Sequence, residues 1–339
     1  MNLKEIAKQA GVSSATVSMV LHNKDGVSKE TRIKIENMLR ENEYKISDKL
    51  EIMGTSGAKN IRFLKYSLSS YLVDDNPGFI SSIIDSVERE CRRLGYNLMM
   101  TAFKKKNADE IFQNLKKENP DGIVLLGTEW TDEDCKYLDG MNIPIVVLDN
   151  YIPNRPLNCV TGSPQANIST AMRFLYNKGH REIGYLMNTE PSCNCIESYK
   201  SYRETVCELG LKLDENIIFN IMPTFAGAYE SMKEILKTRS AMPTALLTNN
   251  DNLALGAMKA LKESGYRVPE DVALIGSDDT AAAAMSDPPL TTMHPDCKRI
   301  GIWAMRLLCD IIEYPDIPVT KIRLHSKLVE RKSTDIKRR

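Results

Sequence analysis

The chain has 339 residues, and its 45 lysines and arginines balance its 45 aspartates and glutamates. A formal charge of zero excludes a protein that coats nucleic acid over its whole surface, although it leaves room for a local DNA-binding module. No apolar run reaches the roughly 20 residues that a membrane-spanning helix needs, and the N-terminus lacks a signal-peptide pattern. We therefore expect a cytoplasmic protein of about two or three domains that does not enter a membrane.

The cysteine spacing bears on metal and redox chemistry. The chain has eight cysteines and no CxxC pair, and the closest two are Cys193 and Cys195. A single-residue spacing is poor for a tetrahedral metal site, and isolated cysteines in such a chain are usually reduced and buried. The sequence therefore predicts no disulfide framework, no metal site and no cofactor.

The first 46 residues predict three short helices. Apolar residues recur at helical spacing from the N-terminus to Gly11, the residue type that ends a helix through a positive φ. Ser13 is placed to cap a second helix, and Ser28 is placed to cap a third helix that extends to Tyr44. Helical hairpins also occur in proteins that bind no DNA, so this pattern alone leaves DNA binding open.

The segment LKEIAKQAGVSSATVSMVLHNKDGVSKETRIKIENMLRENEY closely resembles the headpiece of the LacI/GalR family of bacterial repressors. In that family the second helix of a helix-turn-helix enters the major groove of DNA. The resemblance implies base contacts from Ser14, Ala15 and Met19 and phosphate contacts from Ser13, Thr16, Ser18 and Ser28, and we add Leu3 and His22 as DNA-binding candidates.

One position of this helix departs from the family pattern. Family members commonly carry arginine where this chain has Met19, and arginine reads guanine bidentately whereas methionine offers an apolar contact. Ala15 and Met19 can contact a thymine methyl, and His22 stands where the family often has asparagine. We therefore expect an operator that differs from the commonest family site.

The linker, residues 47–60, also departs from the family. Relatives usually have a Pro-Asn pair and a hinge helix whose leucine wedges into the minor groove, and this chain lacks the pair. Ser47 is able to cap a single turn that places Met53 at the wedge position with Leu50 on the same face. A flexible tether that ends in the 54–57 segment is the alternative, and the sequence leaves both open.

From residue 61 onward, apolar strand-like runs alternate with amphipathic helices, which is typical of α/β proteins with parallel sheets. The segments NKGHREIGYL, PTALLTNNDNLALGAMKALKESGYRVPEDVALIGSDDT and PPLTTMHPDCKRIGIWAMRLL resemble the periplasmic-binding-protein-like core of the same family. The resemblance implies two lobes and three crossings between them. The predicted divisions are a headpiece at 1–46, a hinge at 47–60, an N-terminal lobe at 61–161 with 292–325, a C-terminal lobe at 162–291 and a tail at 326–339.

Ligands of such sheets bind beyond the carboxyl ends of the strands, here in the cleft between the lobes. Asp278 follows the run ALIGS and matches the acidic ligand-binding residue of the family, where a carboxylate accepts from two neighbouring sugar hydroxyls. For Asp251 and Asp279 we prefer helix capping or hydrogen bonding between lobes. The candidate effector-binding residues are Asn76, Phe79, Asp149, Ser198, Asn250 and Asp278.

Ser198 departs from the family because it occupies the position of an arginine on the ligand-binding helix. Arginine forms charge-assisted forks to hydroxyls or carboxylates, which serine cannot do. Either Tyr199, Lys200 or Arg203 compensates for the missing charge, or the effector differs from those of the relatives.

These observations predict a sequence-specific transcriptional regulator, most simply a repressor, whose affinity for operator DNA is controlled by a carbohydrate or related metabolite. Its expected partners are a pseudo-palindromic DNA duplex, the effector and a second copy of the chain. We expect a dimer rather than a tetramer, because the C-terminal ERKSTDIKRR has no heptad repeat for a tetramerisation helix. A ligand-binding receptor with weak or corepressor-dependent DNA binding is the alternative. No GxGxxG, GxxxxGK[ST] or GxSxG motif supports an enzyme, so no catalytic residue is predicted.

Overall fold

The structure is a computed structural model that describes residues 3–21, 26–41, 59–69, 71–74, 76–190, 192–239 and 241–336. The chain divides into two compact units, Met1–Gly57 and Ala58–Arg339. Among the helices in these ranges, none combines the length and the apolar character that crossing a membrane requires.

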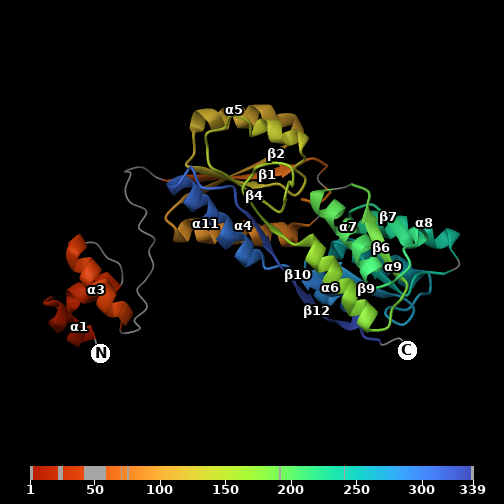
Figure 1. The fold of residues 1–339 in the computed structure, drawn as a ribbon. Helices are drawn as coiled ribbons and strands as arrows, with labels where there is room; N and C mark the ends of the chain where they lie inside the picture. The colour runs from red at the N-terminus through yellow and green to blue at the C-terminus, as the bar shows by residue number, and fades with distance from the viewer. Residues whose placement is uncertain are drawn as a thin grey trace. The chain divides into compact units, whose positions relative to one another are not determined.

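The described residues of the first unit form three helices (Figure 1), and the second and third begin at the predicted caps. Gly11 has a φ of +74°, as expected of a residue that ends a helix. The Ser13 hydroxyl accepts a hydrogen bond from the Thr16 amide at 3.1 Å, and Ser28 caps its helix in the same way. The helices are α1 (Leu3–Ala10), α2 (Ser14–Leu21) and α3 (Lys29–Glu41).

A small hydrophobic core holds these three helices together. Its buried side chains come from all three helices, and Leu3 packs against it from the start of α1. Lys34 donates a hydrogen bond to the backbone oxygen of Ala10, which satisfies one of the carbonyls left free at the end of α1. The buried members are Ile6, Ala7, Ala10, Val17, Val20, Ile35 and Leu39.

The second unit is built on two six-stranded sheets, and we call the part around each sheet a lobe. The first lobe has the strand order β11-β5-β4-β3-β1-β2, and the second has β12-β10-β9-β8-β6-β7. Every strand pair is parallel except β10 with β12. The predicted α/β class with two parallel-sheet lobes is therefore confirmed.

The strands of the first lobe are β1 (Asn60–Ser67), β2 (Asn97–Lys104), β3 (Gly122–Leu126), β4 (Ile145–Leu148), β5 (Cys159–Gly162) and β11 (Lys321–Leu324). Those of the second lobe are β6 (Ile183–Asn188), β7 (Ile218–Ile221), β8 (Ala245–Leu247), β9 (Ala273–Ser277), β10 (Thr291–His294) and β12 (Lys327–Val329). Seven of these strands, β1, β2, β3, β4, β6, β8 and β9, coincide with apolar runs of the sequence, whereas β5, β7, β10, β11 and β12 were not predicted. Each of those five has only three or four residues and includes at least one polar residue, so it lacks the continuous apolar run that marks the equally short β4 and β8.

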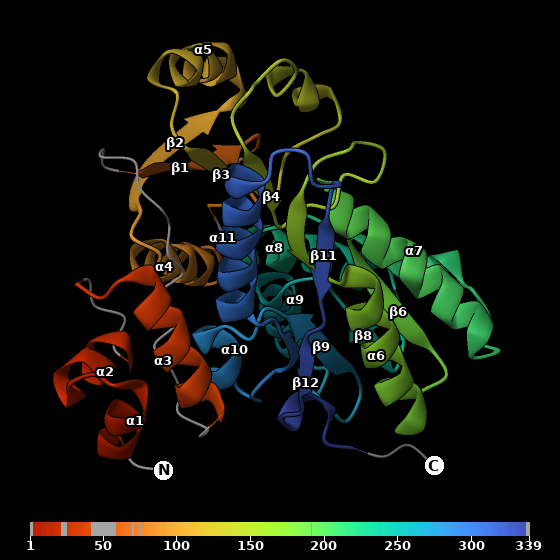
Figure 2. The same ribbon diagram turned by 60° about the vertical axis from the view of Figure 1, so that its left-hand side comes forward.

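Helices cover both faces of each sheet (Figures 1 and 2). In the second lobe α8 and α9 pack on the face that carries Leu246, whereas α6 and α7 pack on the face that carries Leu247. Because both faces of the sheet are buried, β8 needs consecutive apolar residues rather than an alternation of apolar and polar residues.

The α-helices of the second unit are α4 (Pro77–Arg93), α5 (Ala108–Glu118), α6 (Pro164–Asn177), α7 (Cys193–Glu208), α8 (Phe225–Thr238), α9 (Asp251–Glu263), α10 (Ala281–Met285) and α11 (Cys297–Glu313), with 3-10 turns η1 (Lys105–Asn107), η2 (Glu133–Tyr137), η3 (Glu215–Ile217) and η4 (Lys332–Thr334).

The strand membership differs from the predicted divisions at the C-terminal end. β10 pairs with β9, and β12 pairs with β10, so both lie in the second lobe. The second segment of the predicted N-terminal lobe began at residue 292, inside β10. The predicted tail began at residue 326, just before β12. The end of the chain is held there because Ser333 accepts from the Thr291 amide at 2.8 Å and donates to the Leu274 carbonyl at 2.6 Å.

Candidate functional site

A cavity opens between the two lobes at the carboxyl ends of their strands. It encloses about 930 Å³ of space free of protein atoms, its opening to solvent included. Residues of both lobes line it, as expected for this type of sheet arrangement. The six residues that the sequence singled out as effector-binding, Asn76, Phe79, Asp149, Ser198, Asn250 and Asp278, all lie in its wall.

Two strand-end carboxyl groups face this cavity, one from each lobe. Asp149 follows β4 with a φ of +56°, and Asp278 follows β9 with a φ of +111°. Backbone in the left-handed region is uncommon for residues other than glycine, and aspartate is among the types that tolerate it best. Such conformations persist where the surrounding structure holds them, and they cluster at functional sites.

Each carboxyl group receives a hydrogen bond from an amide of the opposite lobe. Asn76, at the start of α4, donates from Nδ2 to Asp278 Oδ2 at 2.7 Å. Asn194, in the first turn of α7, donates from Nδ2 to Asp149 Oδ1 at 3.1 Å and to the Asp149 backbone oxygen at 3.0 Å. The sequence did not identify Asn194, because no local pattern distinguishes it from other polar residues in a first helical turn.

Burial raises the pKa of both carboxyl groups. The pKa of Asp149 rises to about 6 because of its burial, which outweighs the hydrogen bonds from Thr128 and Asn194 that favour the ionised form. The pKa of Asp278 is raised well above its usual value by burial and then by the negative charge of Asp251, against the hydrogen bond from Asn76. The cavity therefore holds two acids whose charged forms are poorly stabilised by the protein.

Ser198 lies on α7 with only 3% of its surface exposed, and it lines the cavity. The three candidate substitutes for the missing arginine do not line the cavity, so the second alternative, a different effector, is the one that remains. Tyr199 hydrogen-bonds to Glu215, Lys200 pairs with Glu204 at 3.8 Å, and Arg203 lies over the ring of Tyr199, none of them in the cavity wall. The reason is helical periodicity, which turns these three side chains away from the face that carries Ser198.

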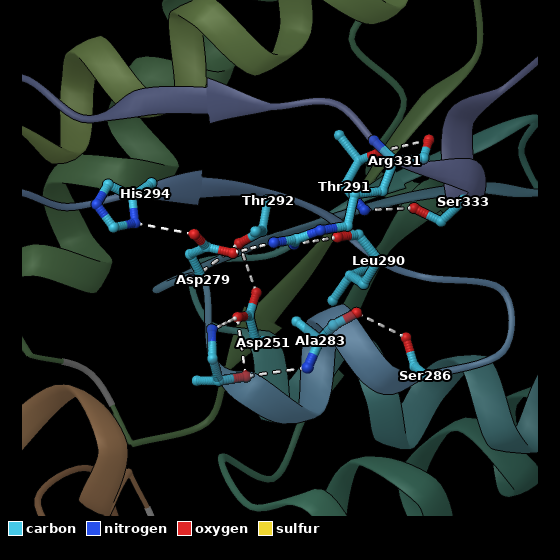
Figure 3. Close-up of polar contacts among 11 residues, drawn as sticks. Asp251, Asp279, Ala283, Ser286, Leu290, Thr291, Thr292, His294, Arg331 and Ser333 are labelled. Carbon is cyan, nitrogen blue, oxygen red and sulfur yellow. Dashed lines mark hydrogen bonds and ion pairs between the residues drawn. The ribbon is translucent and has the colours of Figure 1, made fainter.

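Asn250 and Asp251 have different positions although they are neighbours. Asn250 lines the cavity and also caps α9, because its Oδ1 accepts from the Leu253 amide at 2.9 Å. Asp251 is fully buried behind the wall, where it accepts from Thr292 Oγ1 at 2.6 Å and from the Thr280 amide at 2.8 Å (Figure 3). Burial raises the pKa of Asp251 to about 6.

Asp279 lies next to this network and serves the fold of the second lobe. It pairs with Arg331 and, at 2.9 Å, with the Nδ1 of His294 (Figure 3). Arg331 also donates to the Leu290 carbonyl at 2.8 Å, which fixes the C-terminal segment to β10. Asp251 and Asp279 thus serve the fold, but Asn250 and Thr280 are the helix caps and the partners of both acids lie within one lobe, so the predicted capping or hydrogen bonding between lobes was wrong.

The described cysteines are all free thiols. Cys195 lines the cavity, where its sulfur receives hydrogen bonds from Asn249 Nδ2 at 2.9 Å and Ser192 Oγ at 3.2 Å. In the described part of the chain, no three His, Cys, Asp or Glu side chains come together in a way that would hold a metal ion.

The second helix of the first unit separates a buried face from an exposed one. Val17 and Val20 are fully buried in the three-helix core, whereas Ser14 and Ala15 are exposed. The other predicted DNA contacts are also accessible. Ser13 and Ser28 are exposed, and Leu3, Thr16, Ser18 and Met19 are partly exposed. His22, Leu50 and Met53 lie outside the described residues.

A helix-turn-helix unit and a two-lobed α/β core with a polar cavity together define a class of ligand-responsive DNA-binding regulators. Residues 2–47 match the family of bacterial regulatory proteins named after lacI, and residues 172–334 match the periplasmic binding protein-like domain. The chain is 30% identical over 335 residues to the HTH-type transcriptional repressor PurR of Pasteurella multocida, and the match covers 98% of each chain.

Two solved structures share the fold over almost the whole length. A transcriptional regulator CelR in complex with cellobiose gives a TM-score of 0.73 at 24% identity, covering 98% of this chain and 99% of its own. A lac repressor dimer bound to operator and the anti-inducer ONPF gives a TM-score of 0.72 with the same identity and coverage. The chain belongs to the LacI family, and it is a DNA-binding transcriptional repressor with a ligand-binding domain.

Proposed function

We propose that this repressor binds a small hydroxyl-rich molecule, a carbohydrate or close derivative, in the cavity between its lobes, and that the ligand controls its affinity for operator DNA. The observation that carries the proposal is the convergence of six predicted residues from both lobes on one cavity. A ligand that contacts both lobes favours one lobe arrangement over another, and this differential affinity is what couples a ligand to a distant DNA site.

The chemistry of the wall favours a carbohydrate. The polar side chains that line the cavity are amides, hydroxyls, one thiol and two carboxyls, which suit sugar hydroxyl groups that both donate and accept. A purine-related effector is the second candidate, raised by the similarity to PurR repressors. It is less favoured because Phe79 is the one aromatic side chain among the described residues of the wall, so a base is not stacked between two rings.

For DNA recognition we propose that α2 reads the major groove through its exposed face. Ser14, Ala15 and Met19 are available for base contacts because Val17 and Val20 on the opposite face are buried in the headpiece core. The Ser28 hydroxyl accepts from the helix and donates to Thr31 Oγ1 at 2.8 Å, so a contact with a phosphate oxygen requires this proton to turn towards the DNA. The hinge wedge at Leu50 and Met53 remains a prediction.

We also propose a homodimer that binds a pseudo-palindromic operator. β2 lies at the edge of the first sheet and exposes Met99 and Met100, with 49% and 58% of their surface accessible. Met285 on α10 of the second lobe is 79% exposed. Large exposed apolar side chains on an edge strand are typical of protein interfaces, and a two-fold pair presents two reading helices.

The test is selection of bound duplexes from a random DNA pool by the full-length protein at two salt concentrations, repeated with the Met53→Gly variant. We expect a palindrome whose affinity falls in the variant, which supports a dimer with a working hinge wedge. Recovery of only salt-sensitive binding without sequence preference would contradict the proposal and favour a receptor that needs a corepressor.

A further inference from the structure

The cavity wall holds two carboxyl groups and no cation among the described residues. Asp149 and Asp278 are its only carboxyl groups among the described residues, and no lysine, arginine or histidine of the described chain lines it. Burying carboxylates away from water is costly unless cations or several donors surround them. The protein itself supplies only uncharged donors from Asn76, Asn194 and Thr128.

The cations of β11, the strand that ends shortly before Ser326 of the cavity wall, are engaged elsewhere. Arg323 pairs with Glu197 at 2.7 Å and lies over the ring of Tyr151, with 3.6 Å between its guanidinium carbon and the ring centroid. Lys321 donates to the backbone oxygens of Tyr151 and Ile152. The groups that lower the pKa of the two cavity acids are accordingly amides and a hydroxyl, not cations.

The wall also contains buried acceptor atoms that lack a partner in the described chain. Thr161 is fully buried and lines the cavity, and its Oγ1 makes no hydrogen bond there. Asn167, Asn194 and Asn249 also line the cavity, and although these residues are partly exposed, their Oδ1 atoms are buried without a hydrogen-bond partner in the described chain. For Asn194 the amide nitrogen faces Asp149, so the carbonyl oxygen is left as a free acceptor. A ligand that satisfies these atoms must be rich in donors, because a buried acceptor without a hydrogen bond destabilises the complex.

We infer that the ligand is an amino sugar, whose ammonium group supplies the positive charge that the cavity lacks and whose hydroxyls serve the unpaired acceptors. This inference rests on the proposed effector-binding function of the same cavity. An ammonium group brings three donors and one charge, so it meets both deficits at once. A neutral sugar leaves the carboxylates uncompensated, and a sugar phosphate adds repulsion.

The ammonium group is assigned to Asp278 rather than Asp149. Asp149 already accepts from Thr128 at 2.7 Å and from Asn194, whereas Asp278 accepts a side-chain hydrogen bond from Asn76 alone in the described part of the chain. Ser198 occupies the position where family members carry arginine, so the ligand replaces a charge that relatives hold in the protein.

The experiment measures binding of matched sugars to the full-length protein by titration calorimetry. The probes are glucosamine, galactosamine and mannosamine. Each is compared with its uncharged parent sugar and with the 6-phosphate of that parent sugar. We expect at least one amine to bind about tenfold or more tightly than its parent, with no binding of the phosphates. Asp278→Asn should reduce this preference to less than about threefold, since it removes a charge-assisted hydrogen bond while asparagine tolerates the same positive φ.

The control variant is Asp132→Asn, which removes a surface carboxylate outside the cavity and should leave the preference unchanged. Ser198→Arg provides a second test, because a cation restored to the wall should weaken amine binding and favour the uncharged sugar. Equal or tighter binding of the parent sugars overturns the inference but leaves the proposed effector site intact. Binding of no member of any pair overturns the inference and also counts against a monosaccharide effector.

Discussion

The two lobes build their halves of the cavity wall from matching parts. In each lobe a strand ends in an aspartate at positive φ, and that aspartate is hydrogen-bonded by an asparagine of the other lobe. In each lobe a second, buried acid also holds the wall from behind. Glu129 does so in the first lobe, where it accepts from four backbone amides, and Asp251 does so in the second.

The two halves differ in how completely their strand-end carboxyl groups are satisfied. Asp149 has hydrogen-bond donors from its own lobe and from the opposite one, whereas Asp278 has a single side-chain donor in the described chain and lies near the charge of Asp251. Both carboxyl groups join the lobes through an asparagine, but Asp278 has fewer donors and therefore more acceptor capacity for the proposed ligand.

The largest expected loss of stability comes from replacing Glu129, the buried acid behind the first lobe's part of the cavity wall. Glu129→Ala leaves the amides of residues 68, 69, 72 and 73 without their acceptor, so we expect the free energy of unfolding to fall by about 3 kcal/mol or more. Urea unfolding measures this loss, with Glu129→Gln as a milder control that keeps one oxygen. A fall in the free energy of unfolding of less than about 1 kcal/mol would show that the segment with these four amides does not depend on Glu129.

A glycine on each side of the cavity gives the next test. A Cβ on Gly276 would lie 2.2 Å from Asp251 Oδ1, whereas a Cβ on Gly162 would meet nothing within 4 Å. Gly276→Ala should therefore cost about 1 to 3 kcal/mol of unfolding free energy through overpacking, and Gly162→Ala should cost little. Equal costs in a thermal-unfolding comparison would contradict the different packing of the two walls.

The smallest effect concerns the pH dependence of Asp149. Its pKa is about 6 in the folded protein, above the ordinary value, so the folded state binds the proton more tightly and stability falls as pH rises between about 4 and 6. Asp149→Asn removes this titration, and we expect the variant to gain on the order of 1 to 2 kcal/mol over the wild type at pH 7.5.

The check is denaturant unfolding of both proteins from pH 4 to pH 8. The gain should shrink towards pH 4, where the wild-type carboxyl group is protonated in the folded state and about half protonated in the unfolded state. A difference that stays constant across this range would show that Asp149 does not titrate there.

The sequence predicted the parts of the molecule that local patterns specify. Helix caps at Ser13 and Ser28, and aspartates directly after apolar runs at 149 and 278, carry their signals within a few residues. Asn194 and Glu129 carry no such signal, because their partners lie 45 to 61 residues away along the chain. Their roles depend on how distant segments pack, which a single sequence does not display.

The central claim is that a ligand in the cavity controls binding to the operator. The most direct measurement is the operator dissociation constant of the full-length protein, with and without the sugar that calorimetry identifies, in the wild type and in Asp278→Asn. We expect the sugar to change operator affinity about fivefold or more in the wild type and to leave the variant unaffected. An operator affinity that does not change when the wild-type cavity is saturated with ligand would contradict the account.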